Sequence, residues 1–158
     1  VKHGQRAILN DQLKLAAELE KPLIIHSRPI KGPPDAYQDL IGILAEAKKA
    51  NPRLRGDVHF FVGGVAEAEA LFALNFAISF TAVVTFARDY DAVIRRAPLD
   101  RILSETDAPY VAPASRRRER NDPLAVEEVV AKLAEVRGEP LEAVREALVE
   151  NAKGLFGV

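Results

Sequence analysis

The chain has 158 residues, a formal net charge of -1 and 48% hydrophobic residues, which is the composition of a folded globular domain. Its 22 basic and 23 acidic side chains nearly cancel, so the bulk charge lacks the basic excess typical of a nucleic-acid-binding face. The chain has no cysteine for disulfides or thiolate metal sites, and no apolar run reaches the roughly 18 residues of a membrane helix. We therefore expect one domain, residues 1–158, without a membrane segment and located in the cytoplasm.

The first half of the chain alternates helices with short apolar strands. Apolar residues at helical spacing predict a helix over residues 8–19, and the apolar run at 23–25 predicts a strand buried on both faces. A glycine- and proline-rich loop at 32–34 precedes a second amphipathic helix over 37–47. The next strand is expected at 57–61.

The second half continues this alternation and carries clearer end signals. Asn75 suits the left-handed position that follows a helix, and Gly138 suits the end of a later one. Asp122 and Pro123 supply an N-cap and a first-turn proline. The expected helices cover residues 65–75, 90–97, 122–136 and 140–151, and the expected strands cover residues 76–80 and 101–105.

Strands that alternate with helices, each strand an unbroken apolar run, predict an α/β fold with a parallel sheet and outer helices. The pattern fits either an open doubly wound sheet or a (β/α) barrel. A complete barrel needs eight strands and typically ~250 residues, whereas about four strands are predicted here.

Three chemically active side chains are expected at one edge of this sheet. His26 and His59 stand at the C-terminal ends of successive predicted strands, and Asp107 follows the last strand. Folds of this class place their active sites at that edge, and imidazole nitrogens and carboxylate oxygens are ligands of hydrolytic Zn, Mn or Mg sites. On position alone, the histidines could equally be hydrogen-bonded core residues and Asp107 a turn cap.

Local sequence strings favour the metal site, because they resemble signature segments of the TatD family and occur in the family's order. These strings are KPLIIHSR at 21–28, VHFFVG at 58–63 and ILSETDAPY at 102–110. Shorter matches lie at 12–16, 120–123, 151 and 155–157, so the resemblance covers essentially the whole chain. The segment at 60–62 departs most, because the family more often has a cysteine or serine followed by Phe-Thr or Phe-Ser.

The resemblance implies a TIM-barrel fold and a metal-dependent phosphodiesterase, typically a deoxyribonuclease. It also implies that His26, His59 and Asp107 are metal ligands, with Asp107 additionally a catalytic group. The family's other ligands lie in a His-x-His pair and a Gly-Glu-x-Gly-Leu-Asp segment, and this sequence contains neither motif. We therefore expect the C-terminal half of a (β/α)8 barrel. Its N-terminal half would be missing from a truncated sequence, supplied by a separate chain, or replaced by self-association.

The expected function is hydrolysis of phosphodiester bonds, in DNA or a similar substrate, by a water that a divalent Mg, Mn or Zn ion activates. Two alternatives stay open: a non-catalytic remnant without the N-terminal ligands, and a related amidohydrolase that acts on C–N bonds. Arg28 could contact a substrate phosphate or pair with a carboxylate, and Glu105 could orient a ligand or pair with a cation. For the arginine run at 116–120, a solvated surface is favoured over a phosphate contact.

Overall fold

The computed structural model describes residues 2–29 and 35–158, so the predicted loop at 32–34 lies outside the described residues. A four-stranded parallel sheet has the order β1-β2-β3-β4. The strands are β1 (Leu23–His26), β2 (Gly56–His59), β3 (Phe76–Phe80) and β4 (Ile102–Ser104). The α-helices are α1 (Lys2–Glu18), α2 (Asp35–Ala50), α3 (Val65–Ala73), α4 (Asp91–Arg96), α5 (Val126–Arg137) and α6 (Leu141–Phe156). Short 3-10 helices are η1 (Ala82–Thr85), η2 (Leu99–Arg101), η3 (Ala114–Arg116) and η4 (Pro123–Ala125).

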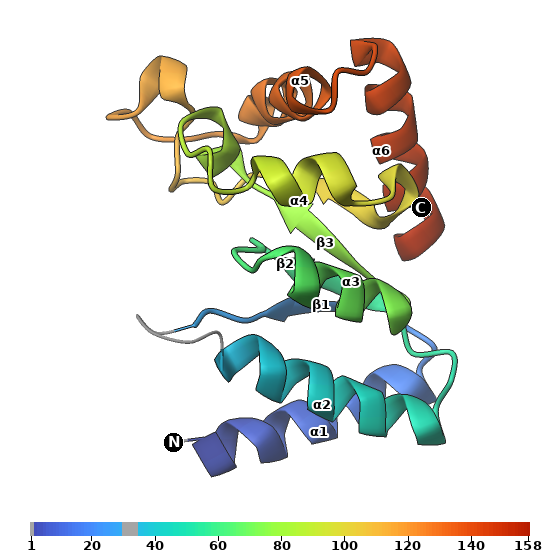
Figure 1. Ribbon diagram of the computed structural model, residues 1–158. Coiled ribbons are helices and arrows are strands. Elements are labelled where there is room, and N and C mark those ends of the chain that lie inside the picture. The colour runs from blue at the N-terminus through green and yellow to red at the C-terminus, as the bar shows by residue number, and fades with distance from the viewer. Residues whose placement is uncertain (1, 30–34) are drawn as a thin grey trace.

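The strand order follows the order of the chain. Each strand pairs in parallel with its successor, which requires a crossover between them, and the crossovers contain helices. Figure 1 shows the helices succeeding one another along the sheet, from α1 and α2 at one end to α5 and α6 at the other. A doubly wound sheet reverses its strand order, whereas a (β/α) barrel does not. The predicted α/β class, with about four parallel strands and outer helices, is confirmed.

The two faces of the sheet differ because side chains alternate along each strand. One row of apolar residues crosses the four strands in register and packs into the core against the helices. This row consists of Ile25, Val58, Ile78 and Ile102. Burying one such side chain contributes roughly 1.5–3 kcal/mol. Asp57 and Ser79 each neighbour a member of this row, so they point to the opposite face of the sheet.

Residues that end elements behave as the sequence predicts in two places and differently in two others. Asn75 follows α3 with a φ of 61°, and Gly138 follows α5 with a φ of 68°, so both left-handed ends are confirmed. The strand predicted at 57–61 ends early, at His59, because Phe60 has a φ of 50° and leaves the extended conformation. The last helix runs past its predicted end at Asn151.

Asn151, the predicted end of the last helix, makes a tertiary contact instead. The Asn151 side chain donates hydrogen bonds to the backbone oxygens of Leu99 at 2.7 Å and Ile102 at 2.9 Å. It therefore ties α6 to the start of η2 and the start of β4 instead of capping its own helix. The first helix also begins earlier than predicted, at Lys2. Its first turns are mostly polar and exposed, so the sequence there has no apolar periodicity from which a helix could be predicted.

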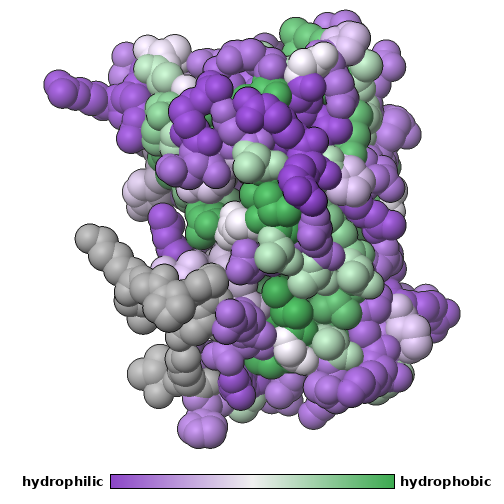
Figure 2. Space-filling model, viewed as in Figure 1, coloured by the Kyte–Doolittle hydropathy of each residue, from purple (hydrophilic) through white to green (hydrophobic). Residues whose placement is uncertain are grey.

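An apolar groove lies between α3 and α4 on the surface of the protein. Figure 2 shows hydrophobic residues gathered over these two helices. Val65, Phe72, Val93 and Pro98 line the groove, together with the ion-paired Glu69 and Arg96. The groove contains none of the predicted site residues. Among the described residues, no helix has the length and apolar character needed to cross a membrane.

Candidate metal centre

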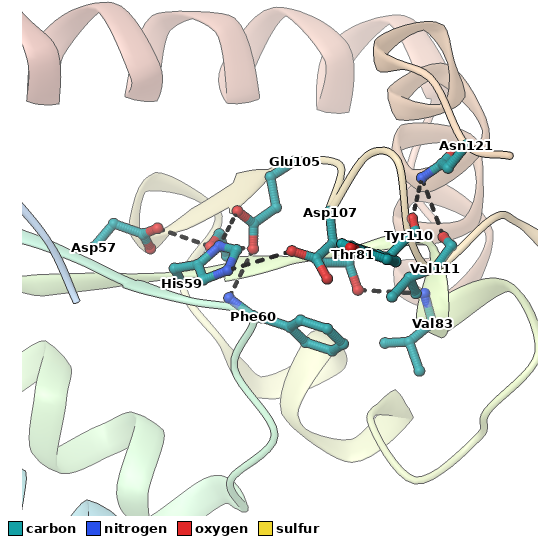
Figure 3. Close-up of polar contacts among 11 residues, drawn as sticks. Asp57, His59, Phe60, Thr81, Val83, Glu105, Asp107, Tyr110, Val111 and Asn121 are labelled. Carbon is teal, nitrogen blue, oxygen red and sulfur yellow. Dashed lines mark hydrogen bonds and ion pairs between the residues drawn. The ribbon is translucent and has the colours of Figure 1, made fainter. Parts of the chain in front are cut away.

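The predicted ligands gather at the C-terminal edge of the sheet. His26 and His59 end β1 and β2 as partners in register, and their ring centroids are 5.7 Å apart. Asp107 follows β4, and its Oδ1 lies 3.8 Å from Nε2 of His59. Figure 3 shows His59 between Glu105 and Asp107. His26 is exposed, and the side chains of His59 and Asp107 remain 21% and 32% exposed, so solvent and ions reach this edge.

Glu105 fixes the orientation of the His59 ring. Its Oε2 lies 2.5 Å from Nδ1 of His59. A carboxylate oxygen can only accept, so Nδ1 carries the hydrogen and Nε2 presents its lone pair on the side of Asp107. Histidine ligands of metal ions commonly have a carboxylate on their second nitrogen, which sets the tautomer and raises the basicity of the ligand.

The chemistry of this donor set fits a divalent metal ion. Bonds from zinc to histidine nitrogen or carboxylate oxygen are roughly 2.0–2.2 Å long. The 3.8 Å between Nε2 of His59 and Oδ1 of Asp107 is less than two such bonds laid end to end, so both atoms can contact one cation. No cluster of three or more His, Cys, Asp or Glu residues within 2–29 and 35–158 could hold a metal ion by itself. The described residues therefore provide only part of a ligand set, and the assignment of these residues as ligands stays a prediction.

The carboxylate of Glu105 has three donors around it. Besides His59, its Oε1 accepts from the backbone nitrogen of Phe60 at 2.7 Å and contacts the Ser79 hydroxyl at 2.8 Å. The Phe60 contact explains the early end of β2, because the positive φ of Phe60 accompanies a backbone N–H that donates to Glu105. This geometry orients His59, and the role of Glu105 beside a metal ligand stays a prediction.

Asp57 is a buried acid that the sequence analysis missed. It is 3% exposed, its Oδ2 lies 2.7 Å from the Ser79 hydroxyl, and its Oδ1 has no hydrogen-bond partner among the described residues. Burial raises the pKa of Asp57 to about 7, and the nearby charge of Glu105 adds to this effect. The hydrogen bond with Ser79 and the proximity of His59 act in the opposite direction. The spacing carried a signal, since Asp57 precedes His59 by two residues and so shares its face of β2.

Ser79 connects the two carboxyl groups. A hydroxyl has one hydrogen, so Ser79 can donate to only one of Asp57 and Glu105. Both contacts are hydrogen bonds only when one carboxyl group carries a proton and donates it to the Ser79 oxygen. Burial, which raises the pKa of Asp57, favours Asp57 over Glu105 as the carrier of this proton.

Asn121 holds the loop that follows Asp107. Its side chain, which is buried, donates to the backbone oxygens of Tyr110 at 2.8 Å and Val111 at 3.2 Å, as Figure 3 shows. Its own backbone nitrogen donates to Pro109 at 3.1 Å. In the sequence, Asn121 is only part of a string that resembles the family; in the structure, its contacts fix the course of the loop at residues 109–111.

Two arginines near this edge lie over aromatic rings. The guanidinium of Arg28 is 5.1 Å from the ring centroid of Phe60, and that of Arg117 is 3.6 Å from the centroid of Phe86. Arg28 makes no ion pair with any described carboxylate, so the carboxylate pairing considered from the sequence is not seen in this part of the chain. Within the arginine run, Arg116 pairs with Asp122 at 2.5 Å.

Comparisons with known proteins agree with the resemblance read from the sequence. The profile of the family described as TatD related DNase matches residues 1–157. The chain is 35% identical over 156 residues to the "Uncharacterized metal-dependent hydrolase YabD" of Bacillus subtilis (strain 168), covering 98% of this chain and 58% of that protein. It is 33% identical over 157 residues to the "3'-5' ssDNA/RNA exonuclease TatD" of Erwinia amylovora, covering 94% of this chain and 57% of that protein.

A solved structure gives the same result for the fold. The crystal structure of YjjV, a TatD homologue from Escherichia coli K12, superposes with a TM-score of 0.88 at 32% identity. The match covers 99% of this chain and 57% of that one. The chain thus spans a little over half the length of these relatives. From the profile match over nearly all of its length, the chain belongs to the family of TatD-related DNases.

Proposed function

We propose that this chain contributes part of the active site of a metal-dependent phosphodiesterase that acts on DNA or RNA. The observation that carries the proposal is the histidine whose Nδ1 is hydrogen-bonded to Glu105 and whose Nε2 lies 3.8 Å from Asp107. The names of relatives support the substrate class, since the Erwinia protein is named a 3'-5' ssDNA/RNA exonuclease and the Bacillus protein a metal-dependent hydrolase.

In this proposal, His26, His59 and Asp107 contribute part of the ligand set of a divalent cation, which is Mg, Mn or Zn. When bound, such an ion polarises a phosphoryl oxygen and lowers the pKa of a water molecule. Asp107 also acts as the catalytic carboxylate and accepts a proton from the attacking water. Arg28, which extends its guanidinium over Phe60, binds a substrate phosphate through two parallel hydrogen bonds.

We further propose that the sheet is one half of a (β/α)8 barrel and that four more strands supply the remaining ligands. Within the described residues, β1 and β4 each pair along one side only. Ile24 is 66% exposed although it lies in register with buried Asp57, on the same face as the site. An exposed apolar side chain beside an unpaired strand edge is a surface that further strands would cover.

Metal binding tests the ligand assignment directly. We expect Mn²⁺ or Zn²⁺ to bind the chain in calorimetry and expect His26→Ala and Asp107→Ala to weaken this binding strongly. His3→Ala is the matched control, because His3 is an exposed histidine on α1. Equal affinity in all four proteins would overturn the assignment of the ligands.

Substrate assays test the reaction class. Side-by-side assays with single-stranded oligonucleotides and with an amide and lactam panel, each with added Mn²⁺, should give turnover of the oligonucleotides alone. Turnover of the amides or lactams alone would contradict the proposed phosphodiesterase and support an amidohydrolase instead.

A further inference from the structure

A chain of polar contacts crosses three strands beneath the candidate metal centre. Asp57 on β2 contacts the Ser79 hydroxyl on β3 at 2.7 Å, and Ser79 contacts Glu105, just after β4, at 2.8 Å. Glu105 then contacts Nδ1 of His59 at 2.5 Å, at the end of β2. The chain therefore leaves β2 at a buried acid and returns to β2 at a predicted ligand.

Packing alone does not account for the hydroxyl of Ser79. The residue is 1% exposed, and its neighbours along β3 are otherwise apolar. An alanine would fill nearly the same space, and a buried hydroxyl costs free energy unless its hydrogen bonds are made. Ser79 makes its polar contacts to two carboxyl groups, of which one holds His59.

The contact with Ser79 restricts the Glu105 side chain. A glutamate has several rotatable bonds, and its carboxylate stays in one place only when both oxygens are held. Oε2 is held by His59, while Oε1 is held by the backbone of Phe60 on one side and by Ser79 on the other. Asp57 in turn fixes the direction of the Ser79 hydroxyl.

We propose that Ser79 is a positioning residue that acts through Glu105 to hold the His59 ring with Nε2 turned toward Asp107. The consequence for metal binding rests on the proposed function, whereas the effect on the ring does not. The bridge is the same whichever of the two carboxyl groups carries the proton.

The orientation of His59 can be measured in the metal-free chain. The sequence has only three histidines, so nitrogen-15 NMR can assign each ring with the help of His3→Ala and His26→Ala. We expect His59 to be the Nδ1–H tautomer in the wild type and a mixture of tautomers in Ser79→Ala. Ser104→Ala is the matched control, since this β4 serine makes no side-chain hydrogen bond to the described residues. Ser79→Thr keeps a hydroxyl and should restore the single tautomer.

Metal affinity gives the second readout. Loss of a group that supports a ligand typically lowers metal affinity about 10–100-fold, and we expect Ser79→Ala to lower Mn²⁺ affinity within that range while Ser104→Ala does not. Folding of each variant is checked by circular dichroism and thermal unfolding.

The two readouts separate two kinds of failure. A folded Ser79→Ala chain with the wild-type tautomer and the wild-type Mn²⁺ affinity would overturn the role of Ser79 and leave the proposed function standing. A wild-type chain that binds no Mn²⁺ would instead show that the ligands of this chain do not hold the ion without the remaining ones, while a changed tautomer in Ser79→Ala would still support the positioning role and an unchanged one would overturn it.

Discussion

Successive residues of each strand point to opposite faces of this sheet, and different interactions stabilise the two faces. On the helix side, Val58, Ile78 and Ile102 are fully buried and stabilise the fold by excluding water. On the other side, Asp57 and Ser79 are just as buried but are held by hydrogen bonds that orient a histidine. Burial alone therefore does not identify a structural residue. Substitutions of Asp107 and Ile78 should separate the two faces, because the first should change metal chemistry and the second stability.

The largest effect is expected on hydrolysis, from a substitution of Asp107 at the solvent-exposed edge of the polar face. Asp107→Ala should reduce metal-dependent hydrolysis by the complete enzyme to background, because the proposed ligand and the proposed proton acceptor are lost together. Its free energy of unfolding should change little, since the side chain is 32% exposed. Oligonucleotide turnover and urea unfolding measure the two effects, and wild-type turnover would contradict the site assignment.

On the apolar face, the opposite pattern is expected. Ile78→Ala removes a fully buried side chain from the middle of β3 and should lower the free energy of unfolding by about 2–5 kcal/mol. Mn²⁺ affinity of the folded fraction should stay near that of the wild type, because Ile78 points away from the site. A large loss of Mn²⁺ affinity with little loss of stability in Ile78→Ala would contradict the assignment of separate roles to the two faces.

Asp57 should make stability depend on pH. Its pKa is raised from 3.8 to about 7 in the folded chain, so the folded state binds the proton more tightly than the unfolded state. The stability from this group is fully present below pH 4 and is lost as the pH rises toward 7, at about 1.4 kcal/mol per pH unit. The groups that face it are Ser79, Glu105 and His59.

Asp57→Asn isolates that dependence, because asparagine resembles the protonated acid in shape and charge. We expect the two proteins to have similar free energies of unfolding near pH 4 and the variant to be the more stable one at pH 8. Urea unfolding from pH 4 to pH 8 measures both free energies of unfolding. In their difference, the contributions of the other carboxylates cancel, because both proteins contain them. If the free energies of unfolding of the two proteins differed by the same amount at every pH, the pKa of Asp57 would not be raised in the folded chain.

A smaller effect is expected at the loop after Asp107. Asn121→Ala removes two hydrogen bonds to the backbone oxygens of Tyr110 and Val111 and should cost about 1–3 kcal/mol. The matched control is Asn10→Ala, at an exposed position of α1. Stability equal to that of the control would show that the loop is held by other contacts.

Much of the fold could be predicted because its signals are local. Short runs that contain apolar residues located the strands, and the left-handed residues Asn75 and Gly138 located the ends of helices. The exceptions depend on distant residues. The turn at Phe60 is linked to a carboxylate 45 residues away, and Asn151, the predicted end of α6, donates to oxygens about 50 residues away.

The candidate site was predicted less completely. His26, His59 and Asp107 could be named from motifs and from the rule that parallel strands end at one edge. Asp57 and Ser79 could not be singled out, because their partners depend on the register between strands. The alternation of side chains was nevertheless present in the sequence, since Asp57 precedes His59 by two residues and Glu105 precedes Asp107 by two.

The sequential strand order has a consequence for the order of events during synthesis. Each strand pairs with its predecessor, so the sheet can grow one βα unit at a time as the chain leaves the ribosome. The contact between His59 and Glu105 spans 46 residues and cannot form before β4 has emerged. A nascent chain that ends before β4 would present its two edge histidines without either carboxylate. The carboxylate partners of the two histidines therefore join the proposed site only after the other three strands have been made.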